Sequence, residues 1–405
     1  MYKYPTQFWL LCLSGMLFFG SFGIVIPDLP AHLTAMGGED HIGLIIFLFT
    51  ISALISRPFS GKLADEWGRI PVMVFGALVS SLAALMYPFA SSVWFFLSVR
   101  VFHGFCTGFK PTGTAAYVAD IVPTDRRGAA MGIVGFVSNI GTALGAALGP
   151  YITKTYSIDA MFMTSLALGV VSVLVLIGMK ETLPNRKKFS IERLAVKKHE
   201  FFEPRVLMPS IVLFMTVFTY GTVLTLGPDL SDKLGMYNRG LYMFFYVGAS
   251  LLVRIVAGRM SDIHGRVAVL KISIPVIAFG TLLMGTSDIR LPFIELEPIA
   301  SGISNDQLQF IASSIIIGLG VGMSSPSIYA WTIDLSDDRF RGRGIATMYI
   351  FLEAGIGLGA LLSGYLYSQL NNNILIPFIL SAMLSSMAFV YLILKSRRKL
   401  ESETG

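Results

Sequence analysis

Long apolar stretches alternate with short polar segments along the whole chain. Each stretch approaches the ~20 residues with which an α-helix crosses the hydrocarbon core of a membrane. Twelve spans are expected, at about residues 8–27, 43–60, 71–90, 93–118, 128–152, 160–179, 207–226, 241–257, 267–285, 310–331, 345–366 and 374–394. The pattern predicts an all-α membrane protein. Because the first span is full length, we expect it to remain in the protein and not to be cleaved as a signal peptide.

Composition agrees with a lipid environment. Of the 405 residues, 54% are hydrophobic and 14% are charged, whereas about a quarter of the residues of a soluble domain are charged. Both cysteines, Cys12 and Cys106, fall inside predicted spans. This placement excludes a disulfide framework and a thiolate zinc cluster, and we expect no metal site.

The basic residues predict the orientation, because cytoplasmic loops retain Lys and Arg. With the N-terminus inside, the outer loops hold only Lys154, Lys233, Arg239 and Arg290. Both termini are then cytoplasmic. The net charge of +6 follows from this topology and does not require a nucleic-acid partner.

An internal repeat divides the chain into halves. The segment GKLADEWGR at Gly61 recurs as GRMSDIHGR at Gly258, and further on Asp120 has its counterpart in Asp334. We expect an N-terminal six-helix bundle at 1–180, a cytoplasmic linker at 181–206, and a C-terminal six-helix bundle with a cytoplasmic tail at 207–405. The second half carries an external insertion within 287–307. An even number of spans in each half makes the halves parallel repeats.

The chain resembles the major facilitator superfamily in its twelve spans, its long central loop and the signature G-x-L-x-D-x-x-G-R. The first copy of the signature is matched by Gly61, Leu63, Asp65, Gly68 and Arg69, and the second by Gly258, Asp262, Gly265 and Arg266. Ile70 and Met260 depart from it. The resemblance implies two pseudo-twofold-related bundles around a central cavity.

The repeated segments predict an inner gate. Glycines allow helices to approach closely, Asp65 can satisfy free N–H groups at a helix start, and Arg69 can pair with carboxylates or with helix C-termini. The alternative is a loop whose charges serve only topology and solvation. Arg57 and Arg254 lie just before the two copies, where reaching the helix end or the headgroups is favoured over substrate contact.

The fourth span carries Arg100, His103 and Lys110, which a helix places within an arc of about 80°. Arg100 and Gly104 resemble a signature of proton-coupled members, so Arg100 would influence a nearby proton carrier. A structural tie between spans is the alternative for Arg100. His103 can titrate near neutral pH or serve as a packing residue, and Lys110 can face the cavity or reach the headgroups.

The fifth span places Gly141, Gly145 and Gly149 at every fourth position, followed by Pro150, which can bend the helix. Gly141, Gly149 and Pro150 resemble an exporter signature of drug and metabolite antiporters, with Thr153 where a glycine is usual. A stripe for close helix packing explains the same residues.

The eleventh span places Glu353 near the bilayer midplane, at the repeat position of Asn139. An acid at this depth is a functional candidate for proton loading, and an ion pair with a cation of another span is the alternative. Tyr220 and Tyr329 offer aromatic cavity surface or simple packing. Asp28 and Asp229, at equivalent outer ends, can cap helices or line an outer gate, and solvated acids at the membrane edge are the favoured interpretation.

No phosphate-binding loop, HExxH or Gly-x-Ser-x-Gly motif occurs in the sequence. The leading hypothesis is a secondary transporter that works by alternating access and exports a small organic compound in exchange for protons, without a cofactor. An uptake symporter of an organic anion is the alternative, and a lipid flippase or membrane enzyme is less favoured. We expect a monomer in a bacterial cell membrane, with lipid, protons and a small-molecule substrate as its partners.

Overall fold

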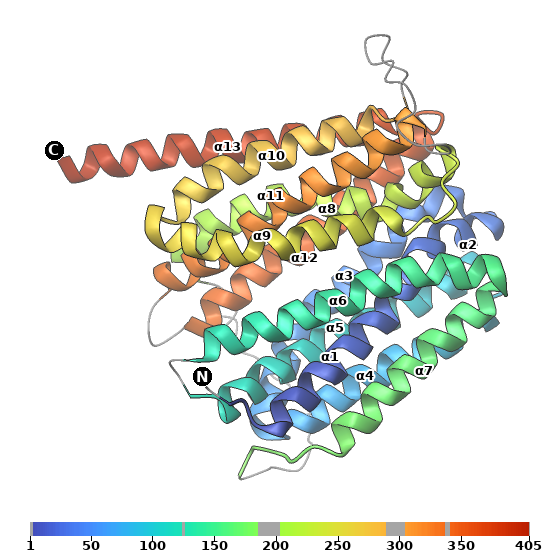
Figure 1. The fold of residues 1–405 in the computed structure, drawn as a ribbon, viewed down its shortest axis with the longest axis horizontal. Coiled ribbons are helices and arrows are strands. Elements are labelled where there is room, and N and C mark those ends of the chain that lie inside the picture. The colour runs from blue at the N-terminus through green and yellow to red at the C-terminus, as the bar shows by residue number, and fades with distance from the viewer. Residues whose placement is uncertain (1–2, 124–125, 185–202, 289–303, 337–340, 405) are drawn as a thin grey trace. The chain divides into compact units, whose positions relative to one another are not determined.

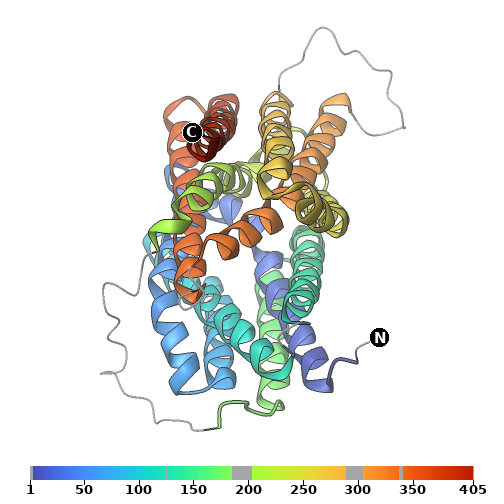
Figure 2. The same cartoon turned by 90° about the vertical axis from the view of Figure 1, so that its left-hand side faces the viewer.

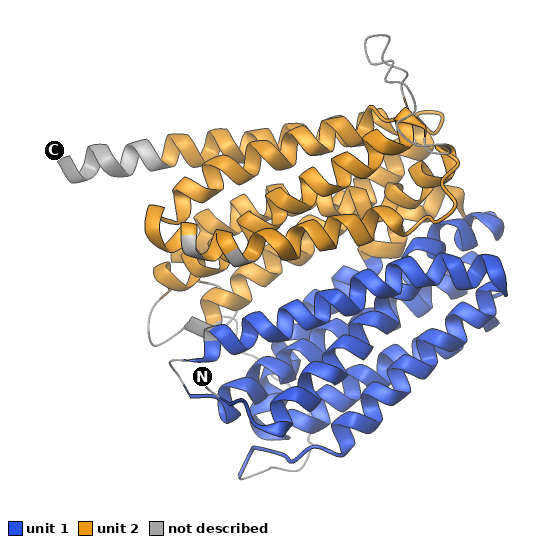
Figure 3. Ribbon diagram, in the orientation of Figure 1, with its two compact units in different colours: residues 1–37, 48–201 blue, residues 38–47, 202–405 orange. Residues whose placement is uncertain are grey.

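The computed structural model describes residues 3–123, 126–184, 203–288, 304–336 and 341–404, and every regular element in these ranges is a helix (Figure 1). The chain forms two compact units (Figure 3). Unit 1 comprises residues 1–37 and 48–201, and unit 2 comprises residues 38–47 and 202–405. The predicted linker at 181–206 and the insertion within 287–307 lie largely outside the described residues.

Unit 1 contains six long helices, the second of which begins in residues assigned to unit 2. They are α1 (Thr6–Val25), α3 (Ile42–Glu66), α4 (Arg69–Met86), α5 (Val93–Ile121), α6 (Arg127–Thr155) and α7 (Ile158–Ile177). Short helical turns η1 (Ile26–Asp28), α2 (Leu29–Ala35), η2 (Glu39–His41) and η3 (Tyr87–Phe89) connect them.

Unit 2 contains six further long helices. After the short turn η7 (Pro204–Val206) they are α8 (Leu207–Lys233), α9 (Leu241–His264), α10 (Arg266–Gly285), α11 (Asn305–Leu335), α12 (Arg341–Gln369) and α13 (Leu375–Thr404). The prediction of an all-α membrane fold with six long helices in each half is confirmed.

Ten of the described helices are long and apolar enough to cross a membrane, and α9 makes eleven when its two segments, which meet at 45°, count as one span. The remaining long helix is α5, whose 29 residues include Arg100, Lys110 and Asp120. Its length suffices for a crossing, and its lower apolarity reflects Arg100 and Lys110, which are buried, together with Asp120, which is exposed near the end of the helix.

The same helix pairs recur in both units (Figure 1, Figure 2). Helix α1 lies along α6 and α7 as α8 lies along α12 and α13, and α4 lies along α5 and α7 as α10 lies along α11 and α13. The internal repeat of the sequence is therefore also a repeat of helix packing.

Buried hydroxyl groups join helices at corresponding places in the two units. Ser21 on α1 bonds Ser165 on α7 at 3.0 Å, and Thr222 on α8 bonds Ser381 on α13 at 2.7 Å. Ser14 and Ser172 form a second α1–α7 pair at 2.9 Å. Such hydrogen bonds hold helices together where lipid supplies no hydrophobic driving force.

The glycine stripe of α6 lies directly against the backbone of α1. A Cβ at Gly145 would stand 2.8 Å from the amide nitrogen of Ile24. Gly141 faces the backbone of Met16, and Gly149 faces that of Ile24. Close backbone packing therefore accounts for all three glycines, and the helix continues through Pro150 to Thr155.

Gly145→Leu should separate α1 from α6 and lower the free energy of unfolding by about 1–3 kcal/mol, the usual cost of overpacking. Thermal unfolding of the detergent-solubilised protein measures the effect. Gly132→Leu is the matched control on the same helix, because a Cβ at Gly132 meets nothing within 4 Å in its own unit. Equal melting temperatures for the two variants would contradict the packing role.

Candidate functional site

Arg69 joins three helices of unit 1 at the first copy of the repeated motif. Helix α3 continues through the motif to Glu66, so that only Trp67 and Gly68 separate it from α4. The guanidinium of Arg69 donates from Nη1 to Asp65 Oδ1 at 2.8 Å and from Nε to Asp120 Oδ2 at 3.1 Å. Nη1 also donates to the carbonyl of Ala64, near the C-terminus of α3.

Arg266 forms the same cluster in unit 2. It donates to Asp262 on α9, and its Nε donates to Asp334 Oδ2 on α11 at 3.1 Å. Sequence reasoning assigned no role to Asp120 or Asp334. Their correspondence in the repeat was a signal that marks both positions as candidates, although it does not name the arginines as their partners.

Glu181 supplies the helix cap that was expected from Asp65. Its two carboxylate oxygens accept hydrogen bonds from the backbone N–H groups of Arg69 and Ile70, at 3.0 Å each. These groups open α4 and have no partner within the helix. Asp65, at the end of α3, is occupied with the Arg69 side chain instead.

Gly68 and Gly265 occupy the same turn in the two copies, with φ of +134° and +87°. Residues other than glycine rarely adopt this backbone conformation. The surroundings differ, because a Cβ at Gly68 would lie 2.6 Å from Glu181 Oε2, whereas one at Gly265 meets nothing within 4 Å in its own unit.

Arg100 and His103 belong to one buried network inside unit 1. Arg100 donates from Nη1 to Tyr87 Oη at 3.1 Å, Tyr87 Oη lies 3.0 Å from His103 Nδ1, and His103 Nε2 lies 3.1 Å from Ser80 Oγ. The guanidinium also lies over the ring of Phe49, 4.5 Å from its centroid. The side chains of Arg100 and His103 are 0% and 1% exposed.

The donors of this network fix its direction. Arg100 Nη1 lies 3.3 Å from His103 Nδ1 as well as near Tyr87 Oη. A guanidinium can only donate, so Nδ1 is an acceptor and takes the hydroxyl proton of Tyr87 in a hydrogen bond. Nε2 then carries the imidazole proton and donates to Ser80. His103 is therefore a neutral acceptor that holds Tyr87 and Arg100 in place.

Lys110 lies apart from this network. It follows Arg100 by ten residues on α5, which is about 15 Å at 1.5 Å per residue. Its Nζ stands 4.9 Å from the ring centroid of Phe18 on α1. With 1% exposure it is enclosed in unit 1. The structure thus brings together two of the three ionisable residues of the fourth span.

The remaining predicted residues lie on separate helices. Glu353, 6% exposed, lies on α12, while Tyr329 on α11 is 38% exposed. Tyr220 on α8 stacks on Tyr246 of α9, with ring centroids 5.6 Å apart. Asn139 is half-buried on α6 of unit 1.

Thr153, which departs from the exporter signature, has a structural partner. Its hydroxyl donates to Asp28 Oδ2 at 2.7 Å and so links the end of α6 to the turn after α1. Asp28 is 2% exposed. A glycine at residue 153 could not supply this hydrogen bond.

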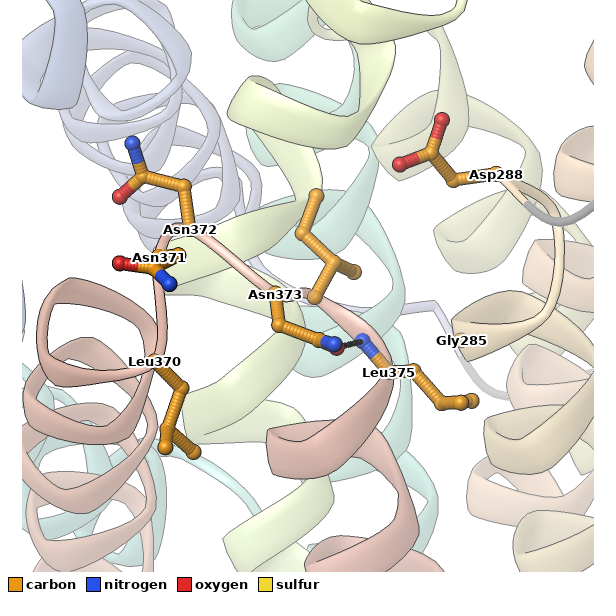
Figure 4. Close-up of a pocket in the computed structure, with 8 residues that line it drawn as sticks. Gly285, Asp288, Leu370, Asn371, Asn372, Asn373 and Leu375 are labelled. Carbon is orange, nitrogen blue, oxygen red and sulfur yellow. Dashed lines mark hydrogen bonds between the residues drawn. The ribbon is translucent and has the colours of Figure 1, made fainter.

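A polar pocket of about 340 Å³ lies at the end of unit 2 opposite the repeated motif (Figure 4). Asp288 and the asparagines at 371–373 line it. Lys233 lies beside it, pairing with Asp288 at 3.9 Å and donating to the carbonyl of Asn372 at 2.7 Å. None of the predicted site residues lines this pocket. Within the described ranges no cluster of three His, Cys, Asp or Glu residues is placed to bind a metal.

Comparison with known proteins identifies a family. The model described as Major Facilitator Superfamily matches residues 11–287 and 239–405. Among curated relatives, an uncharacterised MFS-type transporter of Methanocaldococcus jannaschii is 22% identical over 88% of this chain and 89% of its own length. The quinolone resistance protein NorA of Staphylococcus aureus is 24% identical over 89% of this chain and 90% of its own.

A third relative, the multi-drug resistance efflux pump PmrA homologue of Lactococcus lactis, is 27% identical over 78% of this chain and 76% of its own. Two solved structures share the fold. The human organic anion transporter MFSD10 has a TM-score of 0.70 at 17% identity, covering 96% of this chain and all of that one. A D-xylose-proton symporter has a TM-score of 0.77 at 16% identity, covering 96% and 97%.

Gly68→Ala should destabilise the protein more than Gly265→Ala. Both variants place a Cβ at a φ and ψ that only glycine adopts readily, which costs about 1–3 kcal/mol, but only the first also displaces the Glu181 cap, worth about 1 kcal/mol more. Chemical or thermal unfolding of the two variants measures the difference. If they unfold alike, Glu181 does not contribute to stability.

His103→Leu should lower the free energy of unfolding by about 1–3 kcal/mol, because Tyr87 and Ser80 then lose a buried hydrogen-bond partner. Thermal unfolding measures this loss. His103→Gln keeps an acceptor and a donor and should recover part of the stability. A leucine variant as stable as the wild type would show that the network contributes nothing to folding.

Proposed function

The chain belongs to the major facilitator superfamily, and from this membership we propose that it exports a small organic compound in exchange for protons. The family consists of transporters, and the long apolar helices make the chain an integral membrane protein. The finer proposal draws on two relatives, named a quinolone resistance protein and a multi-drug resistance efflux pump.

The observation that carries the proton coupling is Glu353. Its carboxyl group is 6% exposed in the middle of α12. An acid at this depth is expensive to keep charged and is commonly part of a proton pathway. His103 is a poorer carrier, because a second proton on its ring would occupy the nitrogen that accepts from Tyr87.

The two arginine clusters suit a gate that opens in each cycle. The side chains of Asp65 and Asp262 are 72% and 69% exposed, and ion pairs so close to water contribute only about 0–1 kcal/mol. They can break and form again at little cost. Alternating access, in which the substrate site opens to one compartment at a time, would use such a contact where helices within one unit shift during the cycle.

Arg100 would act as a fixed charge. Its network is buried and fully enclosed in unit 1, so breaking it would leave polar groups unsatisfied. We propose that it stays intact through the cycle and sets the local potential, while Glu353 gains and loses the proton. Both termini would be cytoplasmic and the protein a monomer in a bacterial cell membrane.

Uptake of an organic anion with protons is the second candidate. Arg100 and Lys110 are both buried in unit 1, and the described helices of that unit carry acids only near their ends. One solved neighbour is named an organic anion transporter and another a proton symporter. The direction of the pH gradient that makes substrate accumulate in vesicles distinguishes export in exchange for protons from uptake together with protons.

Glu353→Gln should abolish transport driven by a pH gradient in sealed proteoliposomes, while exchange of labelled for unlabelled substrate persists without a gradient. A panel of dyes, drugs and organic anions provides the substrates. Glu39→Gln is the matched control, because it neutralises an exposed carboxylate. Unchanged gradient-driven flux in Glu353→Gln would reject the proton role.

Direction is read from the same vesicles. For transporters oriented as in the cell, accumulation of substrate in acidic vesicles indicates exchange for protons. Accumulation from an acidic medium indicates symport and would overturn the export proposal.

A further inference from the structure

Arg254 lies on α9 where the two segments of this helix, Leu241–Arg254 and Val256–His264, meet at 45°. From the sequence, its side chain is expected to reach the helix end or the headgroups. Its Nη2 instead donates to Ser325 Oγ on α11, at 3.1 Å.

The guanidinium of Arg254 is incompletely satisfied. Its Nε is buried and makes no hydrogen bond, and no carboxylate pairs with it among the residues that the structure describes. Three other arginines of unit 2 each pair with an acid, namely Arg239 with Asp232, Arg266 with Asp262 and Asp334, and Arg343 with Glu203. A buried donor without a partner is costly and calls for an acceptor.

The packing of α11 against α9 holds Ser325 opposite Arg254. A Cβ at Gly318 would lie 3.0 Å from the carbonyl carbon of Tyr246, and one at Gly322 would lie 2.8 Å from Cα of Ser250. The two helices therefore touch through their backbones over the turns that precede Arg254. The Arg254–Ser325 pair is a rigid feature of unit 2 because of this contact.

Two stacked aromatic rings lie two turns before the cation, on α9 and on its neighbour α8. Tyr246 is eight residues before Arg254 on α9, about 12 Å along the axis. Its ring stacks on Tyr220 of α8, with 18° between the ring planes. Tyr246 is 6% exposed and Tyr220 is half-buried, so the pair offers a flat apolar surface two turns from a positive charge.

We propose that Arg254 and Ser325 bind the carboxylate of a substrate whose aromatic ring lies against Tyr220 and Tyr246. A guanidinium offers parallel N–H donors that match a carboxylate, and Nε is the donor left open. The Ser325 hydroxyl can accept from Arg254 and donate to the anion at once. This inference rests on the proposed transport function and names its substrate class as aromatic carboxylates.

Equilibrium binding of radiolabelled benzoate to the full-length protein in detergent tests the site, with benzamide as the uncharged analogue. Arg254→Gln should weaken benzoate binding about tenfold or more, as expected for a lost charged hydrogen bond. Arg254→Lys keeps the positive charge but lacks the parallel N–H donors of a guanidinium. Its affinity for benzoate should lie between those of the wild type and of Arg254→Gln. Arg239→Gln removes the same charge from the Asp232 pair in unit 2 and should leave binding unchanged.

Wild-type affinity for benzoate in Arg254→Gln would overturn the inference, as would equal affinity of the wild type for benzoate and benzamide. Melting temperatures show whether each variant is folded, and the lysine variant keeps the test valid if the glutamine variant unfolds. Because binding is measured without a membrane gradient, it is independent of energy coupling. Binding without gradient-driven flux would contradict the proposed function alone, whereas flux of other solutes without benzoate binding would contradict this inference alone.

Discussion

The structure depends on one constraint, which is that hydrocarbon offers no hydrogen bonds to polar groups. Helices satisfy their backbones internally, but every buried polar side chain must find its partner on a neighbouring helix. Ser21 with Ser165 and Thr222 with Ser381 are the simplest solutions. Glycines serve the same end in the same units, since Gly145 on α6 lets the backbone of α1 approach closely. Packing and polar satisfaction are therefore parts of one design in each unit.

Charged groups follow two patterns, according to their depth. Near the helix ends, Arg69 and Arg266 bind carboxylates that remain open to water, so that the bonds can be exchanged at low cost. In the interior, Arg100 is enclosed by Tyr87, His103 and Phe49. A low dielectric makes such an arrangement strong when complete and costly when broken. The first pattern suits a moving contact and the second a permanent charge.

The two units share their helix pairs but differ in the groups that they bury. Unit 1 encloses Arg100 and Lys110, whereas unit 2 encloses Glu353 and carries Arg254 against Ser325. Glu181 caps the motif turn of unit 1, whereas no described atom of unit 2 comes within 4 Å of a Cβ at the corresponding Gly265. The duplication thus supplied a common frame, on which each half acquired different chemistry.

The sequence by itself determined the twelve helices, their division into halves and the repeated motif, because apolar length and repetition are local properties of the chain. It could not decide which groups meet. Asp120 reaches Arg69 across 51 residues and Glu181 caps Ile70 across 111, contacts that no spacing rule predicts. The glycines of α6 fitted both a signature and a packing stripe until their contact with α1 was known. The hydrogen-bond partners of Arg100 and Arg254 also required the tertiary structure. A position in a helix determines the face on which a side chain lies, but not which residue of another helix it contacts.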